Sequence, residues 1–156
     1  MKKILSTNTG STSDALLLVL RIGIAVLMLL HGIPKMMMLF GDGPIQFLPA
    51  FGMSAETSLL LTVAAEVGCS LLILFGAATR IAAIPLIITM LVAIFMVHGD
   101  DPFAKKELAV FYLLVYTALL IGGSGKYSVD QLIQRRNKSV NNAGVETEDP
   151  TVLIYQ

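Results

Sequence analysis

The composition of the 156-residue chain excludes an ordinary water-soluble domain. Hydrophobic residues make up 55% of the sequence and charged residues 14%, with eleven basic and eleven acidic side chains and no formal net charge. A soluble domain has about 25% charged residues, and a small soluble fold cannot hide this much apolar area from water. We therefore expect a membrane protein with no nucleic-acid partner, and the length allows a single domain.

Four apolar runs fill most of the chain. They predict helices at about 14–34, 55–78, 81–97 and 107–123, and a helix needs about 20 mostly apolar residues to span a bilayer. The fourth run reaches this length only by including Glu107 at its start and the glycines that begin at Gly122 at its end. We predict an all-α fold, a transmembrane four-helix antiparallel bundle, with residues 14–135 as the membrane domain.

The segments outside these runs differ in character. Residues 1–13 are expected to be a cytoplasmic N-terminal segment without a cleavable signal, because a polar stretch, STNTGSTSD, follows the first lysines. The apolar connection between the first two helices is broken by glycines and prolines, which predicts an interfacial loop. A lid over an internal cavity is the alternative. Residues 136–156 lose apolar periodicity and are expected to be a disordered cytoplasmic tail.

Basic residues predict the orientation of the four spans. The N-terminus, the second connection and the C-terminal tail share one side, whose basic residues are Lys2, Lys3, Arg80, Lys126, Arg135, Arg136 and Lys138. The other side carries Lys35, Lys105 and Lys106. Because basic residues in short loops concentrate on the cytoplasmic side, we expect both termini in the cytoplasm.

Arg21 and Glu66 are ionisable side chains inside predicted spans. Leaving one ionised and unpaired in hydrocarbon costs roughly 2.5–3.5 kcal/mol. Counting inward from the ends of two antiparallel helices puts the two side chains at similar depth, which predicts an Arg21–Glu66 ion pair. Such a pair either locks two helices together or also binds a ligand, and the sequence leaves both interpretations open.

Helical periodicity gathers further candidates on the side of the first helix that carries Arg21. Met28, His31 and Lys35 fall within about 80° of it, and with Glu66 they form the predicted intramembrane polar cluster. Alternatives remain for two of them. Lys35 is long enough to extend its ammonium group to the interface, and a histidine at a helix end can bond to backbone or water.

The secondary candidates are Arg80, His98 and Glu107. His98 lies at the end of the third predicted helix beside two acidic residues, but no HxxH, HxxE or CxxC spacing supports a metal site, and we expect none. Cys69 is the single cysteine, so an intramolecular disulfide or dithiol relay is excluded.

An ordered set of short motifs runs through the chain. They are RIG at 21–23, HGxxK at 31–35, EVG at 66–68, GxxTR at 76–80 and GSGKYSVD at 123–130. Over residues 14–135 this order resembles the DoxX family of small four-helix bacterial membrane proteins. The resemblance implies an inner-membrane location. It also implies an association with redox enzymes, since some members look like subunits of thiosulfate:quinone oxidoreductases and others partner soluble redox enzymes.

Two classes of function follow from the resemblance and the polar cluster. In the first, the chain is a non-catalytic membrane subunit or scaffold associated with quinone- or thiol-linked redox enzymes. In the second, it binds, transforms or moves a quinone or lipid-like molecule in a cavity containing Arg21 and Glu66. A quinone is the candidate cofactor, and the expected partners are the bilayer, a soluble oxidoreductase and a second copy of the chain.

Overall fold

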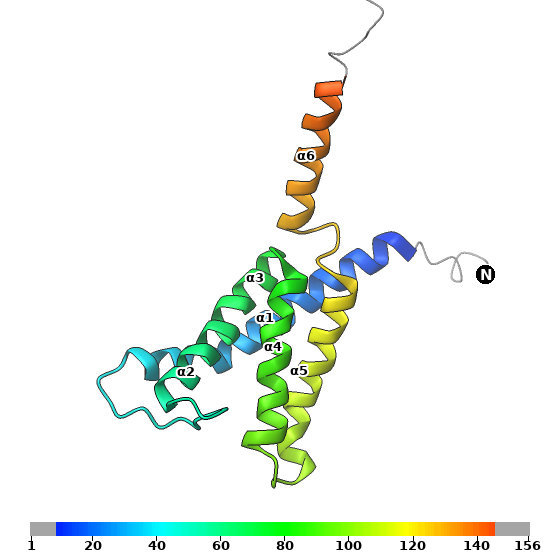
Figure 1. The fold of residues 1–156 in the computed structure, drawn as a ribbon. Helices are drawn as coiled ribbons and strands as arrows, with labels where there is room; N and C mark the ends of the chain where they lie inside the picture. Colours follow the sequence, from blue (N-terminus) through cyan, green and yellow to red (C-terminus); the bar gives the residue numbers. More distant parts are fainter. Residues whose placement is uncertain (1–8, 146–156) are drawn as a thin grey trace, which may run out of the picture.

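The computed structural model describes residues 9–145 and is helical throughout, with no strand in that range (Figure 1). In chain order the elements are α1 (Thr9–Phe40), α2 (Ala55–Val63), η1 (Ala64–Cys69), α3 (Ser70–Phe75), α4 (Thr79–Val92), η2 (Ala93–Val97), α5 (Phe103–Gly122) and α6 (Val129–Val145). The two η elements are π-helical turns. The predicted all-α class is confirmed for the described residues.

Three helical stretches in the described part of the chain are long and apolar enough to cross a membrane. They are Thr12–Phe40, Ala55–Phe75 and Thr79–Val97. The second joins α2, η1 and α3 end to end, and the third joins α4 to η2. Helix α5 has 20 residues but begins with FAKKE, which places three charges near its start. The fourth span, and with it the four-helix antiparallel bundle, remains a prediction.

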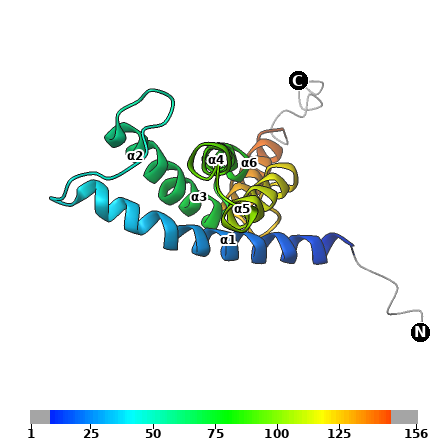
Figure 2. The same ribbon diagram turned by 90° about the horizontal axis from the view of Figure 1, so that it is seen from below.

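Helix α1 crosses the other helices obliquely, whereas α4 and α5 pack side by side (Figures 1 and 2). Helix α6 extends away from the rest (Figure 1). Two ends of the helical body can be distinguished. The Gly76 end comprises residues 76–78 and 123–128, and the His98 end comprises residues 41–54 and 98–102.

The core is small and the outer surface is apolar. Side chains from α1, α3, α4 and α5 form one buried cluster, which includes Met28, Ile73, Leu86 and Tyr116. Only 22–39% of the residues in the three apolar stretches are buried, and large hydrophobic side chains such as Ile81 face outward. An exposed apolar surface of this extent favours lipid as the surrounding medium.

Helix α1 is longer than predicted. The expected helix, residues 14–34, stops at Pro34, but the structure continues it to Phe40 and starts it at Thr9. A proline removes one backbone donor without ending a membrane helix, because neighbouring groups can compensate for the lost hydrogen bond. The segment that follows, residues 41–54, contains no helix.

Within the tail predicted to be disordered, the structure describes residues 136–145 as part of α6, which ends at Val145. The sequence encodes a start signal for this helix. The Ser128 hydroxyl accepts a hydrogen bond from the Gln131 N–H at 3.2 Å, as an N-cap does, and Asp130 adds a favourable charge in the first turn. The rest of the predicted tail, 146–156, and residues 1–8 lie outside the described residues.

Candidate ligand site at the Lys35–Glu66 pair

The structure does not form the predicted ion pair between Arg21 and Glu66. Both side chains are buried, with 1% and 2% exposure respectively. Glu66 pairs instead with Lys35 through its Oε1 atom. Arg21 donates from Nη2 to the backbone carbonyl of Tyr127, at the opposite end of the helices.

The register of α1 against the second apolar stretch explains the different pairing. A Cβ atom added to Gly32 would lie 3.1 Å from the Cβ of Glu66, whereas one added to Gly76 would lie 1.6 Å from Nη1 of Arg21. The eleven residues from Arg21 to Gly32 correspond to about 16 Å along a helix. The predicted Arg21–Glu66 pair required the first two helices to end at the same level. In fact α1 starts at Thr9 and crosses its neighbours obliquely.

Glu66 lies in the π-helical turn η1 and is only half satisfied. Its Oε1 atom accepts from the ammonium of Lys35, but its Oε2 atom is buried and has no hydrogen-bond partner among the described residues. A buried acceptor without a partner costs about 1–3 kcal/mol. π-helical turns are rare and occur frequently at functional sites. The free oxygen is therefore available to a donor other than the described residues of the chain.

Two cavities share the Lys35–Glu66 pair as part of their wall. One has a volume of about 160 Å³ and is also lined by Met28, His31 and Tyr112. The other has a volume of about 270 Å³, and residues from the 41–54 connection together with α2, α4 and η2 complete its lining. Ala93 and His98 line both cavities. The pair thus stands at the boundary between an aromatic cavity and a more apolar one.

Aromatic rings build one wall of the smaller cavity. The His31 ring meets the Tyr112 ring edge-on, with centroids 5.9 Å apart and planes at 87°. Tyr112 in turn stacks on Tyr116 at 6.0 Å. Sequence reasoning did not single out Tyr112, although two tyrosines four residues apart lie on one face of a helix.

The predicted site residues therefore separate into three groups. The residues brought together at the cavities are Met28, His31, Lys35, Glu66 and His98. Arg21 and Arg80 lie at the Gly76 end, where Arg80 is exposed and donates to the carbonyl of Ile121 at 3.1 Å. Glu107 is exposed and lines neither cavity.

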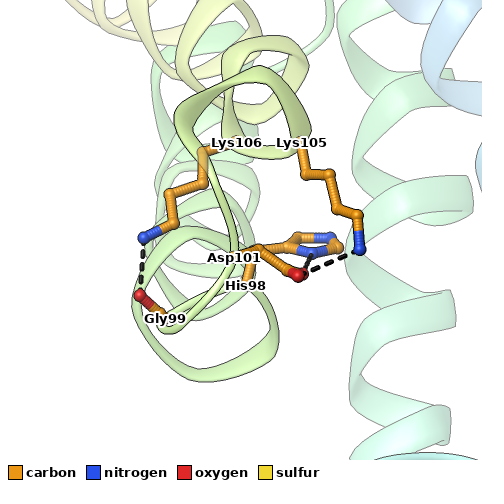
Figure 3. Close-up of polar contacts among 5 residues, drawn as sticks. All are labelled: His98, Gly99, Asp101, Lys105 and Lys106. Carbon is orange, nitrogen blue, oxygen red and sulfur yellow. Dashed lines mark hydrogen bonds and ion pairs between the residues drawn. The ribbon is translucent and has the colours of Figure 1, made fainter.

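The loop at the His98 end is organised around one carboxylate (Figure 3). Asp101 accepts from Lys105 at 2.9 Å and forms a 2.9 Å contact with the His98 ring. The hydrogen bond from His98, followed by that from Lys105, holds the pKa of Asp101 below its usual value. Lys106 donates to the Gly99 carbonyl at 2.6 Å. These contacts position His98 in the wall of both cavities.

A second polar cluster closes the Gly76 end. Gly76 ends α3 in the left-handed region, at φ 68°, and its missing side chain leaves room for the Arg21 guanidinium. The Asp130 carboxylate accepts from the backbone N–H of Ala78 at 2.8 Å and of Thr79 at 3.5 Å, at the start of α4. This cluster joins α1, α3, α4 and α6. The Nη2 atom of Arg21 is bonded within it, whereas Nε and Nη1 are buried and have no hydrogen-bond partner among the described residues.

A model of the DoxX family matches residues 16–99. The chain belongs to the DoxX family. The predicted family is therefore confirmed. The DoxX match contains both members of the Lys35–Glu66 pair and ends just after His98, before the tyrosines of α5.

Two curated proteins are similar over most of their length. An "Uncharacterized protein" of Haemophilus influenzae is 31% identical over 118 residues, covering 71% of this chain and 85% of that protein. "Putative oxidoreductase CatD" of Bacillus subtilis is 27% identical over 125 residues, covering 80% of this chain and 91% of that protein. No solved structure matches.

Proposed function

We propose that this DoxX protein binds a small amphiphile of the quinone class beside the Lys35–Glu66 pair. The observation that carries the proposal is the buried Oε2 atom of Glu66, which no hydrogen-bond donor of the described residues reaches. A quinol hydroxyl would donate to this oxygen, and the ammonium of Lys35 would donate to a quinone carbonyl.

The linings of the two cavities suit a molecule with a polar head and an apolar chain. Drug-sized ligands occupy pockets of about 300–1,000 Å³, and each cavity is smaller than this, at about 160 and 270 Å³. A ligand of this size would therefore occupy both cavities, which share the Lys35–Glu66 pair. A flat head group fits the smaller one, against Tyr112 and His31. An apolar chain fits the larger one, along Phe47 and Leu48 of the connecting loop. In this arrangement the 41–54 connection covers the ligand, as a lid does.

The test is the quinone content of purified protein. We expect wild-type protein extracted from membranes to carry quinone, and Glu66→Gln to carry at least about tenfold less, because a charged hydrogen bond contributes about 1.5–3 kcal/mol. Lys35 is 31% exposed, so its ammonium can turn to solvent in this variant. Glu107→Gln is the matched control, since it removes an exposed carboxylate that lines neither cavity.

A second variant tests the cavity without changing any charge. Ala93 lines both cavities, so Ala93→Leu should fill the space and expel quinone while the ion pair remains. If Glu66→Gln and Ala93→Leu both fold and retain as much quinone as wild type, the proposed site is wrong.

We also propose that the protein acts as a membrane subunit for a redox enzyme. The name of the Bacillus subtilis relative, "Putative oxidoreductase CatD", favours this second role. Purification in mild detergent separates the two roles. A soluble oxidoreductase recovered in stoichiometric amount supports the subunit, and bound quinone without a protein partner supports ligand binding alone. The same preparation reports whether two copies of the chain associate.

The proposed topology has α5 as the fourth span and both termini in the cytoplasm of a bacterial inner membrane. Its support is the distribution of charge. The basic side chains at or next to the Gly76 end are Arg80, Lys126, Arg135 and Arg136. The carboxylates at the same end accept hydrogen bonds from backbone N–H groups, Asp130 from Ala78 and Asp14 from Lys126. A cysteine placed at Ser124 in a Cys69→Ser background should resist a membrane-impermeant thiol reagent added to intact cells. Labelling there would reverse the orientation.

A further inference from the structure

A groove of about 480 Å³ lies between the end of α3 and the first two turns of α6. Its apolar part is formed by Phe75, Val129 and Leu132. These side chains are 63%, 37% and 65% exposed, which is costly in water but not in contact with acyl chains. The groove is separate from the Lys35–Glu66 cavities, since it lies at the opposite end of the helices.

Cationic groups border this apolar surface. Lys126 and Arg135 both line the groove, and no acidic side chain of the described residues does so. Lys126 forms a 3.2 Å ion pair with Asp14, and an ammonium group has two further N–H donors. The guanidinium of Arg135 offers a planar pair of donors that matches a phosphate. The groove therefore combines an apolar floor with two donors for an anion.

The groove is held in shape by contacts deeper in the protein. Tyr127, which lines the groove, has its backbone carbonyl fixed by buried Arg21. Ser128 donates to the Gly125 carbonyl at 2.7 Å and accepts from the first turn of α6. The Asp130 N–H donates to the Gly76 carbonyl at 3.1 Å, which ties α6 to the end of α3. A ligand thus meets a preformed site.

We propose that this groove binds one anionic phospholipid. The phosphate accepts hydrogen bonds from Arg135 and Lys126, the Tyr127 ring lies at the level of the head group, and the acyl chains follow Phe75 and Leu132 toward the membrane. Tyrosine is enriched at this level of a bilayer, and basic residues next to a span attract anionic lipids. Charge complementarity selects an anionic head group over a zwitterionic one.

Lipid binding is tested with delipidated full-length protein in detergent, using phosphatidylglycerol and phosphatidylcholine as probes and native mass spectrometry as the readout. Wild type should bind one phosphatidylglycerol about fivefold more tightly than phosphatidylcholine. Arg135→Gln should lose most of this preference, by about fivefold. Arg136→Gln is the matched control, because it removes the same charge about 100° around the helix, outside the groove.

Three results would overturn the proposal. The first is an equal loss in Arg135→Gln and Arg136→Gln, which would indicate a diffuse surface charge. The second is equal binding of the two lipids by wild type. The third is competition by glycerol phosphate, a water-soluble head group, at concentrations similar to the lipid, because a phosphate site alone would not need the apolar floor. Phe75→Ala tests that floor directly, and weaker lipid binding in this variant supports the proposal.

Discussion

Among the glycines whose surroundings the structure describes, Gly76 is the one at which replacement by alanine should destabilise the protein most. Alanine in the left-handed region, at φ 68°, costs about 1–2 kcal/mol. The new Cβ would also lie 1.6 Å from Nη1 of Arg21 and 2.6 Å from the Cβ of Ser128, so the guanidinium must move. Moving it breaks the hydrogen bond to the Tyr127 carbonyl, a charged contact of about 1.5–3 kcal/mol. We expect a total loss of about 2.5–5 kcal/mol.

The measurement is the free energy of unfolding in detergent, and Gly52→Ala is the matched control. Gly52 has a similar backbone angle, φ 75°, but nothing lies within 4 Å of an added Cβ. Gly52→Ala should therefore lower the free energy of unfolding only by the cost of placing alanine in the left-handed region, about 1–2 kcal/mol. A double-mutant cycle of Gly76→Ala with Arg21→Ala should show a coupling of at least about 1 kcal/mol, since residues in contact are not additive. Equal losses at the two glycines would refute the assigned contact.

Three further predictions rest on other contacts. Asp130→Ala removes the acceptor for two N–H groups at the start of α4 and should lower the free energy of unfolding by about 0.5–2 kcal/mol, as loss of a cap does; an unchanged unfolding curve would contradict that role. Gly32→Ala would place a methyl group 2.8 Å from a neighbouring valine and should cost about 1–3 kcal/mol in the same assay, whereas Gly23→Ala, with open space around it, should be neutral or slightly stabilising. Because the pKa of Asp101 is lowered in the folded state, chiefly by the hydrogen bond from His98, its contribution to stability is present above the ordinary carboxyl pKa and is lost as the pH falls through the lowered one; His98→Ala should flatten this acid dependence in a pH series of unfolding curves, and an unaltered profile would exclude the contact.

The sequence predicts helix type and the polar face of α1, because both depend on local periodicity. A stripe at helical spacing correctly placed Met28, His31 and Lys35 on one side, and the structure brings these three to the same cavity. The motif set also led to the correct family. Periodicity does not give the depth of a residue along the helix bundle, because that depth depends on the offset between neighbouring helices along their axes.

The partner of Glu66 shows where local reasoning fails. Helix tilt and the extension of α1 beyond its predicted ends shift Arg21 to the level of Gly76, so Lys35 is the cation that reaches Glu66. The π-helical turn around Glu66 was likewise not predicted, because a single inserted residue has no signal in apolar spacing. Similarly, Asp130 accepts hydrogen bonds from Ala78 and Thr79, which lie 52 and 51 positions away in the sequence. Local patterns do not reveal contacts over such separations.

The contact between Arg21 and Tyr127 also has a consequence for biosynthesis. Its two partners are separated by 106 residues, and a ribosome adds about 5–20 residues per second. The hydrogen bond from Arg21 to the Tyr127 carbonyl can therefore form only about 5–20 s after Arg21 has been synthesised. During that interval its long side chain can reach the nearby head groups. The final anchoring of α1 is thus a late step, completed only when the last apolar helix has been made.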